Sequence, residues 1–134
     1  MRLLVQIALV SLGSTLGGLL RWAVTAGLGQ WLGAAFPYGT FVINISGSLF
    51  LGWFSTVLSE RFLLGDNAWL SADDLKLMVA VGFTGAYTTF STFEFETYGK
   101  LEDGKGLVGA IYLLGSVLLG LVAVYVGVAL ARWR

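Results

Sequence analysis

The sequence predicts an all-α membrane protein with four transmembrane helices. Of its 134 residues, 57% are hydrophobic and only 12% are charged, and the mean hydropathy is +0.82. This balance is typical of membrane proteins rather than soluble domains. The apolar residues also gather in four stretches, each close to the roughly 20 residues that cross a bilayer. We expect a single four-helix domain that covers residues 1–134.

The first apolar segment spans about residues 3–28, where only Gln6 and Arg21 interrupt small and apolar side chains. We interpret it as a retained helix rather than a signal peptide, because its basic start is a single arginine and no small-residue cleavage site closes it. The other segments span about residues 38–58, 75–98 and 107–131. The polar stretches 60–74 and 99–106 are predicted loops, and four crossings would leave both termini on one membrane face.

The third segment contains an unusual stretch, Gly82–Glu94, with two glycines, five Ser or Thr residues and no Leu, Ile or Val. Gly is about 1 kcal/mol less favourable than Ala inside a helix. We therefore predict that the third helix is broken at its centre, between Gly82 and Thr89. Broken backbone is tolerated at membrane depth only where protein or water satisfies its polar groups, so the break suggests an ion or substrate site.

Composition also excludes several functions. The chain has no Cys and no His, which removes the nucleophilic Ser-His-Asp and Cys-His arrangements and all disulfides. The net charge is zero, so no basic surface argues for nucleic acid. We predict that the chain is not an enzyme and binds no nucleic acid.

Polar residues recur on helical faces of the second and fourth segments. Thr40, Asn44 and Ser48 stand four apart in the second segment, which places them on one face. They join helices by hydrogen bonds or they line a pathway. Tyr112 and Ser116 begin a similar face in the fourth segment, but the next positions at that spacing are Gly120 and Val124, so this polar track is short.

Several aromatic and charged residues in the apolar segments each allow two interpretations. Phe90 and Phe93 stand three apart and either pack or turn their positive ring edges toward an anion. Arg21 either snorkels to the headgroups or provides a fixed positive charge at a pore mouth. Glu94 and Glu96 are buried and paired, or else hydrated at the helix end.

Small residues four apart are typical of close helix contacts. The pairs are Gly13 and Gly17, Ser48 and Gly52, and Ser116 and Gly120. Because four helices enclose little interior, we infer an oligomer, most simply a dimer; packing within one subunit is the alternative for any single pair. The basic residues outside the first segment divide five to two between the two faces, and this weakly favours termini inside. They are Arg2, Arg61, Lys76, Arg132 and Arg134 on the terminal face, against Lys100 and Lys105.

These residues resemble the Fluc (CrcB) family of small bacterial fluoride channels. The resemblance covers the whole chain. It is carried by Gly82-Phe83-Thr84-Gly85, by the run Thr88-Thr89-Phe90-Ser91-Thr92-Phe93, and by Asn44 and Arg21 in the earlier segments. It implies a homodimer with dual topology, in which two antiparallel copies form two fluoride pathways. In the cell this would allow passive export of cytoplasmic fluoride across the bacterial inner membrane.

The resemblance also implies roles for individual residues. We expect the fluoride pathway to include Phe90, Phe93, Asn44, Tyr112, Ser116, Thr89 and Thr40. Arg21 matches the charge at the aqueous vestibule, and Glu94 the carboxylate after the second phenylalanine. Backbone carbonyls of Gly85 and Thr88, from both subunits, match the positions that hold a structural sodium ion.

Two features depart from what the resemblance implies. Gly120 and Val124 replace hydroxyl residues on the fourth segment, and the five-to-two basic count is lopsided for dual insertion. The rival functions are a small dual-topology multidrug or cation transporter and a non-transporting membrane assembly protein. Such a transporter would need a membrane-embedded carboxylate, and the first segment has none.

Overall fold

The computed structural model describes residues 2–33, 35–61 and 70–133, and every regular element within these ranges is helical. This agrees with the predicted fold class. Residues 62–69 of the predicted loop 60–74, and Arg134 of the basic count, lie outside the described residues.

Three helices are long and apolar enough to cross a membrane. They are α1 (Arg2–Leu32), α2 (Tyr38–Glu60) and α6 (Gly106–Arg132). The end of α1 lies beyond the predicted residue 28, at Gly33, whose φ of +73° is the left-handed conformation in which glycine commonly ends a helix. Gly104, with the same φ, turns the chain into α6.

The third apolar segment is divided into several elements. They are α3 (Ala72–Leu75), the π-helix η1 (Lys76–Thr84), α4 (Gly85–Tyr87) and α5 (Phe90–Glu102). Between α4 and α5, Thr88 (φ −86°, ψ 162°) and Thr89 (φ −151°, ψ 119°) have extended backbone. Nothing in the sequence analysis anticipated the π-helix, a rare form that often accompanies functional sites.

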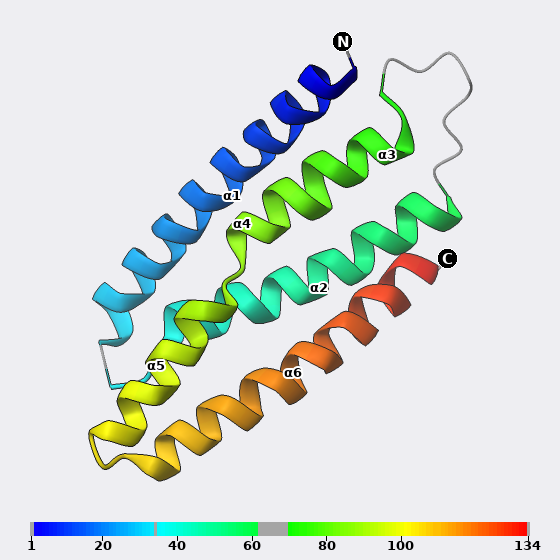
Figure 1. Cartoon of the computed structure of the whole chain (residues 1–134). Helices are drawn as coiled ribbons and strands as arrows, with labels where there is room; N and C mark the ends of the chain where they lie inside the picture. The colour runs from blue at the N-terminus through cyan, green and yellow to red at the C-terminus, as the bar shows by residue number, and fades with distance from the viewer. Residues whose placement is uncertain (1, 34, 62–69, 134) are drawn as a thin grey trace.

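The helices pack as two pairs. α1 lies against η1 and α4, and α2 lies against α6 along most of its length. Figure 1 shows that α1 begins and α6 ends at the same end of the bundle, while α5 descends to the other end. The break between α4 and α5 therefore lies near the middle of the bundle, between helices that pass it without interruption.

Glycines allow these close contacts. A Cβ atom on Gly17 would stand 2.1 Å from the Phe83 carbonyl oxygen, and one on Gly52 would stand 2.6 Å from that of Val124. A Cβ on Gly120 would stand 3.7 Å from the Ser48 hydroxyl oxygen. The predicted small-residue pairs thus pack within one chain, which was the alternative reading. The dimer remains a prediction, but these pairs no longer argue for it.

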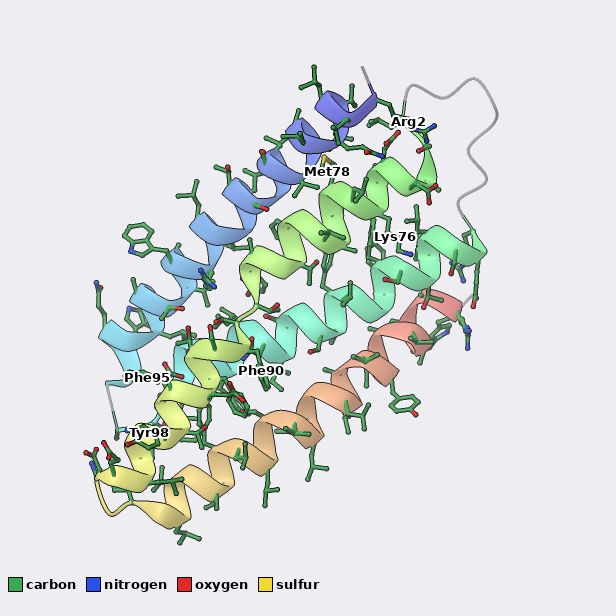
Figure 2. All side chains as sticks on the ribbon, in the orientation of Figure 1. Arg2, Lys76, Met78, Phe90, Phe95 and Tyr98 are labelled. Carbon is green, nitrogen blue, oxygen red and sulfur yellow. The ribbon has the colours of Figure 1, made fainter. Side chains whose placement is uncertain are left out.

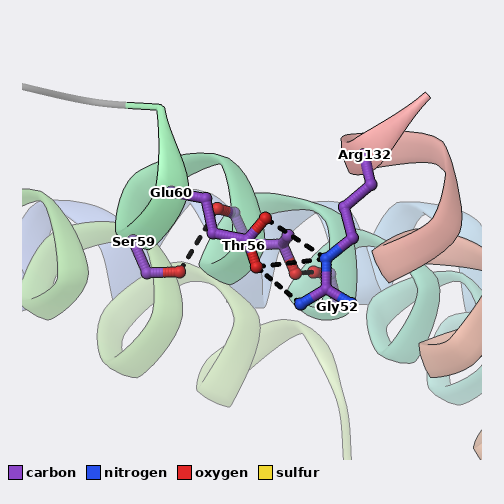
Figure 3. A network of polar contacts seen from close by, with 5 residues as sticks. All are labelled: Gly52, Thr56, Ser59, Glu60 and Arg132. Carbon is purple, nitrogen blue, oxygen red and sulfur yellow. Dashed lines mark hydrogen bonds and ion pairs between the residues drawn. The ribbon is translucent and has the colours of Figure 1, made fainter. Parts of the chain in front are cut away.

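A polar clamp joins α2 to α6 at the end that carries the termini. Both carboxylate oxygens of Glu60 accept hydrogen bonds from the Arg132 guanidinium, at 3.1 and 3.2 Å from its Nε (Figure 3). One turn away the Thr56 hydroxyl donates to the Gly52 carbonyl at 2.8 Å. The ion pair is exposed, so it contributes little to stability by itself. Its geometry does, however, fix the register of the two helices at this end.

Candidate functional site

The break is held by the side chain of Asn44 on α2. In a continuous helix the Thr89 N–H would donate to the Gly85 carbonyl. Here it donates to Asn44 Oδ1 at 2.9 Å, and Asn44 Nδ2 donates to the Thr89 carbonyl at 3.0 Å. The Asn44 side-chain amide therefore provides a hydrogen-bond partner for both the N–H and the carbonyl of Thr89. Because both bonds are made, the orientation of the amide is fixed, and one of its two N–H groups remains free of the break.

Thr89 in turn begins α5 as its N-cap. Its hydroxyl accepts from the Thr92 N–H at 3.3 Å and donates to the Thr92 hydroxyl at 2.9 Å. The Thr92 N–H is the group that would donate to the Thr88 carbonyl in a continuous helix. Together with the Asn44 contact, this cap diverts the usual helical donors from the carbonyls of Gly85 and Thr88.

These two carbonyls are the ones expected to hold sodium, and their surroundings fit such an ion. Carbonyl oxygens are hard ligands that suit a hard cation. Gly85 is exposed, and a Cβ placed on it would approach nothing closer than 4.0 Å. A second chain therefore has room to approach. No group of three or more His, Cys, Asp or Glu side chains occurs in the described ranges.

A cavity of about 280 Å³ lies beside the break, between α2, α5 and α6. It brings together most of the predicted pathway residues. Its polar and aromatic lining includes Asn44, Ser48, Thr88, Thr89, Phe90, Phe93 and Ser116. Residues far apart in the sequence thus meet at one place.

Ser116 is the clearest polar anomaly in this cavity. Its Oγ is buried and, among the described residues, has no hydrogen-bond partner. A buried hydroxyl without a partner costs about 1–3 kcal/mol, and most buried polar atoms in proteins are paired. Ser116 lines the cavity, and its O–H is not used by another described residue.

The two phenylalanines differ in exposure. Phe93 is 5% exposed, and its ring meets that of Tyr112 edge-on, with centroids 5.1 Å apart. Phe90 is 70% exposed at the start of α5, with its centroid 6.1 Å from that of Phe93 (Figure 2). Both residues line the cavity. The Phe93 ring is fixed by packing, while the Phe90 ring lies at the open side of the cavity.

A carboxylate for which the sequence left two interpretations open, Glu96, lies at the end of this aromatic row. Glu96 accepts hydrogen bonds from the Thr40 hydroxyl at 2.9 Å and the Tyr112 hydroxyl at 2.7 Å. Both donors are buried, and Tyr112 completely so. Glu94, the residue that the resemblance implies, is instead exposed. It lines neither the cavity beside the break nor the two further cavities described below. Glu96 follows Phe93 at the spacing that separates Phe93 from Phe90, a signal that could have identified it.

Arg21 lies on a second cavity, of about 480 Å³, between α1, α2 and α5. Thr89, Thr92, Thr40 and Glu96 line it as well. Thr89 therefore separates this cavity from the one beside Ser116. Arg21 is half-buried and makes no ion pair with another described residue. Its positive charge is available to the cavity.

The polar track on α6 ends at Ser116. At the next position of this spacing, a Cβ on Gly120 would stand 3.7 Å from the Ser48 hydroxyl oxygen and 3.9 Å from Ile45 Cδ1, which are ordinary contact distances. One turn further on, the Val124 carbonyl lies against Gly52. The packing against α2 therefore does not by itself account for the departure from the expected pattern.

Comparison with known proteins agrees with this geometry. Residues 8–128 match the family model described as CrcB-like protein, Camphor Resistance (CrcB). A protein of Chloroflexus aurantiacus named fluoride-specific ion channel FluC is 39% identical over 96% of both chains. One of Solibacter usitatus with the same name is 42% identical over 92% of this chain and 96% of its own.

A third relative with this name, from Methylococcus capsulatus, is 46% identical over 92% of this chain, and the chain spans about half, 51%, of its length. The matched residues 8–128 take in α2 and the whole segment from α3 to α5, and most of α1 and α6. With its apolar helices, the chain is a multi-pass membrane protein. We conclude that it belongs to the CrcB-like protein family.

Proposed function

We propose that this chain is the subunit of a fluoride-selective ion channel that lets fluoride leave the bacterial cytoplasm passively and so lowers its toxicity. The relatives are named as fluoride-specific ion channels. A family of ion channels also agrees with the prediction that the chain is not an enzyme. The inner membrane is the proposed location, because that is the membrane that encloses the cytoplasm.

The observation that carries the proposal is the unpartnered Ser116 hydroxyl in the cavity beside the break. An anion such as fluoride sheds water only where donors replace it, and it moves on only where each site is weak. The Ser116 O–H and the free N–H of Asn44 are neutral donors. The positive edges of Phe90 and Phe93 would add a weak attraction. Among the residues that the structure describes, no basic side chain lines this cavity, so none of them would trap the ion by a fixed charge.

We propose that two copies assemble as an antiparallel homodimer with two pathways. On α5, Ser91, Thr92 and Glu94 are exposed in the single chain. Polar side chains at membrane depth need protein or water around them, and a second copy would provide that cover. In this arrangement the segment from α3 to α5 acts as the fourth crossing, broken at its centre, and the two breaks meet.

The carbonyls of Gly85 and Thr88, with their equivalents in the second copy, would then hold a structural sodium ion. When bound, the ion supplies positive charge that links the two subunits and is not transported. This chain contributes the extended backbone at Thr88 and the Asn44 contact that diverts the Thr89 N–H from Gly85.

Fluoride efflux from liposomes that contain the purified protein tests this function. We expect fast, voltage-driven efflux of fluoride while chloride is retained. Phe93→Ile should reduce the fluoride rate, because the branched side chain lacks the ring edge. Leu118→Ile, on the exposed face of α6, is the matched control. A folded protein that passes no fluoride would contradict the proposal.

A second candidate, a small transporter of organic cations, gains one observation from the structure. Glu96 is a carboxylate within the segment proposed to cross the membrane, a feature that such carriers need. However, both of its oxygens already accept hydrogen bonds, from Thr40 and Tyr112. Uptake of an organic cation driven by a proton gradient, with no fluoride efflux, would favour this function instead.

A further inference from the structure

A third cavity lies at the end of the bundle away from the termini. It has a volume of about 380 Å³ and is lined by the turn between α1 and α2 together with the second half of α5. Thr40 and Glu96 line both this cavity and the one that contains Arg21, and Thr89 lines both the Arg21 cavity and that of Ser116. The three cavities thus form a series that runs from the break to the end of the bundle.

Three charged side chains line this terminal cavity: Glu96, Lys100 and Asp103. They lie on one side of α5, since positions three and four apart share a helical face. Glu96 accepts from two hydroxyls. Asp103 pairs with Lys105 at 3.6 Å. Lys100 makes no ion pair with any other described residue, so its positive charge is not neutralised by a direct partner.

The local structure fixes where this charge lies. The Lys100 carbonyl accepts from the Lys105 N–H at 2.9 Å, which anchors the residue in the turn between α5 and α6. The α6 helix passes close to its stem, since a Cβ on Gly109 would lie 3.4 Å from Lys100 Cβ. Lys100 is only half-exposed. Its stem is therefore held against α6 while its side chain lines the cavity.

We propose that this cavity is the water-facing mouth of the ion pathway and that Lys100 supplies the charge that concentrates anions in it. The inference rests on the proposed function, because it concerns how fluoride reaches or leaves the same pathway. A positive charge raises the local concentration of anions around it, and of the three charged residues that line this cavity Lys100 is the positive one. The charge of Asp103 is balanced by Lys105, so Lys100 opposes the remaining carboxylate, that of Glu96. The other cation, Arg21, lines the neighbouring cavity, which is farther from the proposed mouth. Lys100 thus precedes it on the route from water.

The size of the effect follows from Coulomb's law. One unit charge about 8 Å from the ion, in a dielectric close to that of water, changes its local concentration by about two- to threefold. The effect should also depend on salt, since the screening length is about 10 Å at 0.1 M but about 3 Å at 1 M ionic strength. A side chain that only stabilises the fold would not show this salt dependence.

The experiment compares fluoride efflux from liposomes that contain the wild-type chain, Lys100→Gln, Lys100→Glu or Lys100→Arg, at low and high concentrations of an impermeant salt. At low salt we expect Lys100→Gln to slow efflux about two- to threefold and Lys100→Glu to slow it further. Lys100→Arg should keep the wild-type rate, and high salt should remove most of the differences. Lys76→Gln is the matched control, because it removes the same charge from an exposed side chain outside the cavity.

Three results would overturn the inference. Lys100→Glu could conduct as the wild type does, the loss could be equal at both salt concentrations, or Lys100→Arg could lose as much as Lys100→Gln. The last two would assign Lys100 a packing role. Failure of the proposed function is recognised separately, since the wild-type chain would then pass no fluoride at either salt concentration.

Discussion

The α2–α6 pair and the segment from α3 to α5 pass through the same bundle but satisfy their backbones in different ways. α2 and α6 are continuous, and they approach so closely that a Cβ on Gly127 would lie 2.2 Å from the Leu49 carbonyl oxygen. The other segment is interrupted, and Asn44 satisfies the N–H and C=O of Thr89. The first region provides a rigid support. The second leaves hydroxyls, an amide N–H and carbonyls available for ions.

Removing the side chain that holds the break should have the largest effect. Asn44→Ala leaves the N–H and C=O of Thr89 without partners, at about 1–3 kcal/mol for each group. We expect fluoride efflux to be abolished and the midpoint of thermal unfolding in detergent to fall. Thr56→Ala, on the same helix, is the control, because its hydroxyl bonds only within α2. Wild-type efflux from Asn44→Ala would show that the break does not depend on this amide.

A methyl group in the α2–α6 contact should reduce stability but not selectivity. Gly127→Ala forces the two helices apart, and overpacking of this kind typically costs about 1–3 kcal/mol. The folded protein that remains should still pass fluoride and retain chloride. Gly115→Ala on the same helix has open space and should leave the unfolding midpoint unchanged. A loss of selectivity in Gly127→Ala would mean that the support and the pathway cannot be separated.

Ser116→Ala should have the opposite pattern, with lower flux and intact stability. The hydroxyl has no partner in the described chain, so its removal breaks no contact within the subunit. If it donates to the passing ion, efflux should fall about two- to tenfold, the equivalent of one hydrogen bond of about 0.5–1.5 kcal/mol. Unchanged flux together with a lower unfolding midpoint would instead assign Ser116 a structural role.

The smallest effect on stability is expected from the contact between Ser71 and Asp74, where the third segment begins. The N–H of Ser71 donates to the Asp74 carboxylate at 3.0 Å and its hydroxyl does so at 2.9 Å, and these bonds hold the pKa of Asp74 below its usual range. This stabilisation is therefore present above the ordinary aspartate value of about 3.9. It is lost as pH falls through the lower pKa of the folded state.

Asp74→Asn should accordingly lower the unfolding midpoint slightly at neutral pH, and the difference from wild type should shrink in strong acid. Asp73→Asn is the control, because Asp73 belongs to the same turn but makes none of these bonds. A difference that grows as the pH falls would contradict the assignment.

The sequence predicts where the third segment is weakest as a helix, but not which side chain bonds to the backbone there. Glycines and hydroxyl residues between Gly82 and Thr89 weaken a helix locally, and this can be seen in one segment. The partner, Asn44, stands 45 residues away from Thr89, and no local pattern specifies that pairing. The choice between Glu94 and Glu96 likewise depended on which helical face meets Thr40 and Tyr112.

The glycine pairs show a different limit of sequence analysis. Spacing four residues apart indicates that helices approach closely, but it does not say which helix approaches. The structure places Gly13 and Gly17 against the backbone of η1 within the same chain. The argument for a second copy now comes from the exposed polar side chains of α5, which only the three-dimensional arrangement reveals.

The central claim is that the ion passes through the cavity beside the break, and a thiol at that point tests it most directly. The chain has no native cysteine, so Ser116→Cys introduces a single reactive site. We predict that labelling with a small thiol reagent, confirmed by the mass of the protein, stops fluoride efflux. The same reagent on Leu118→Cys, on the exposed face of α6, should leave efflux unchanged. Complete labelling of Ser116→Cys with undiminished fluoride efflux would contradict the account.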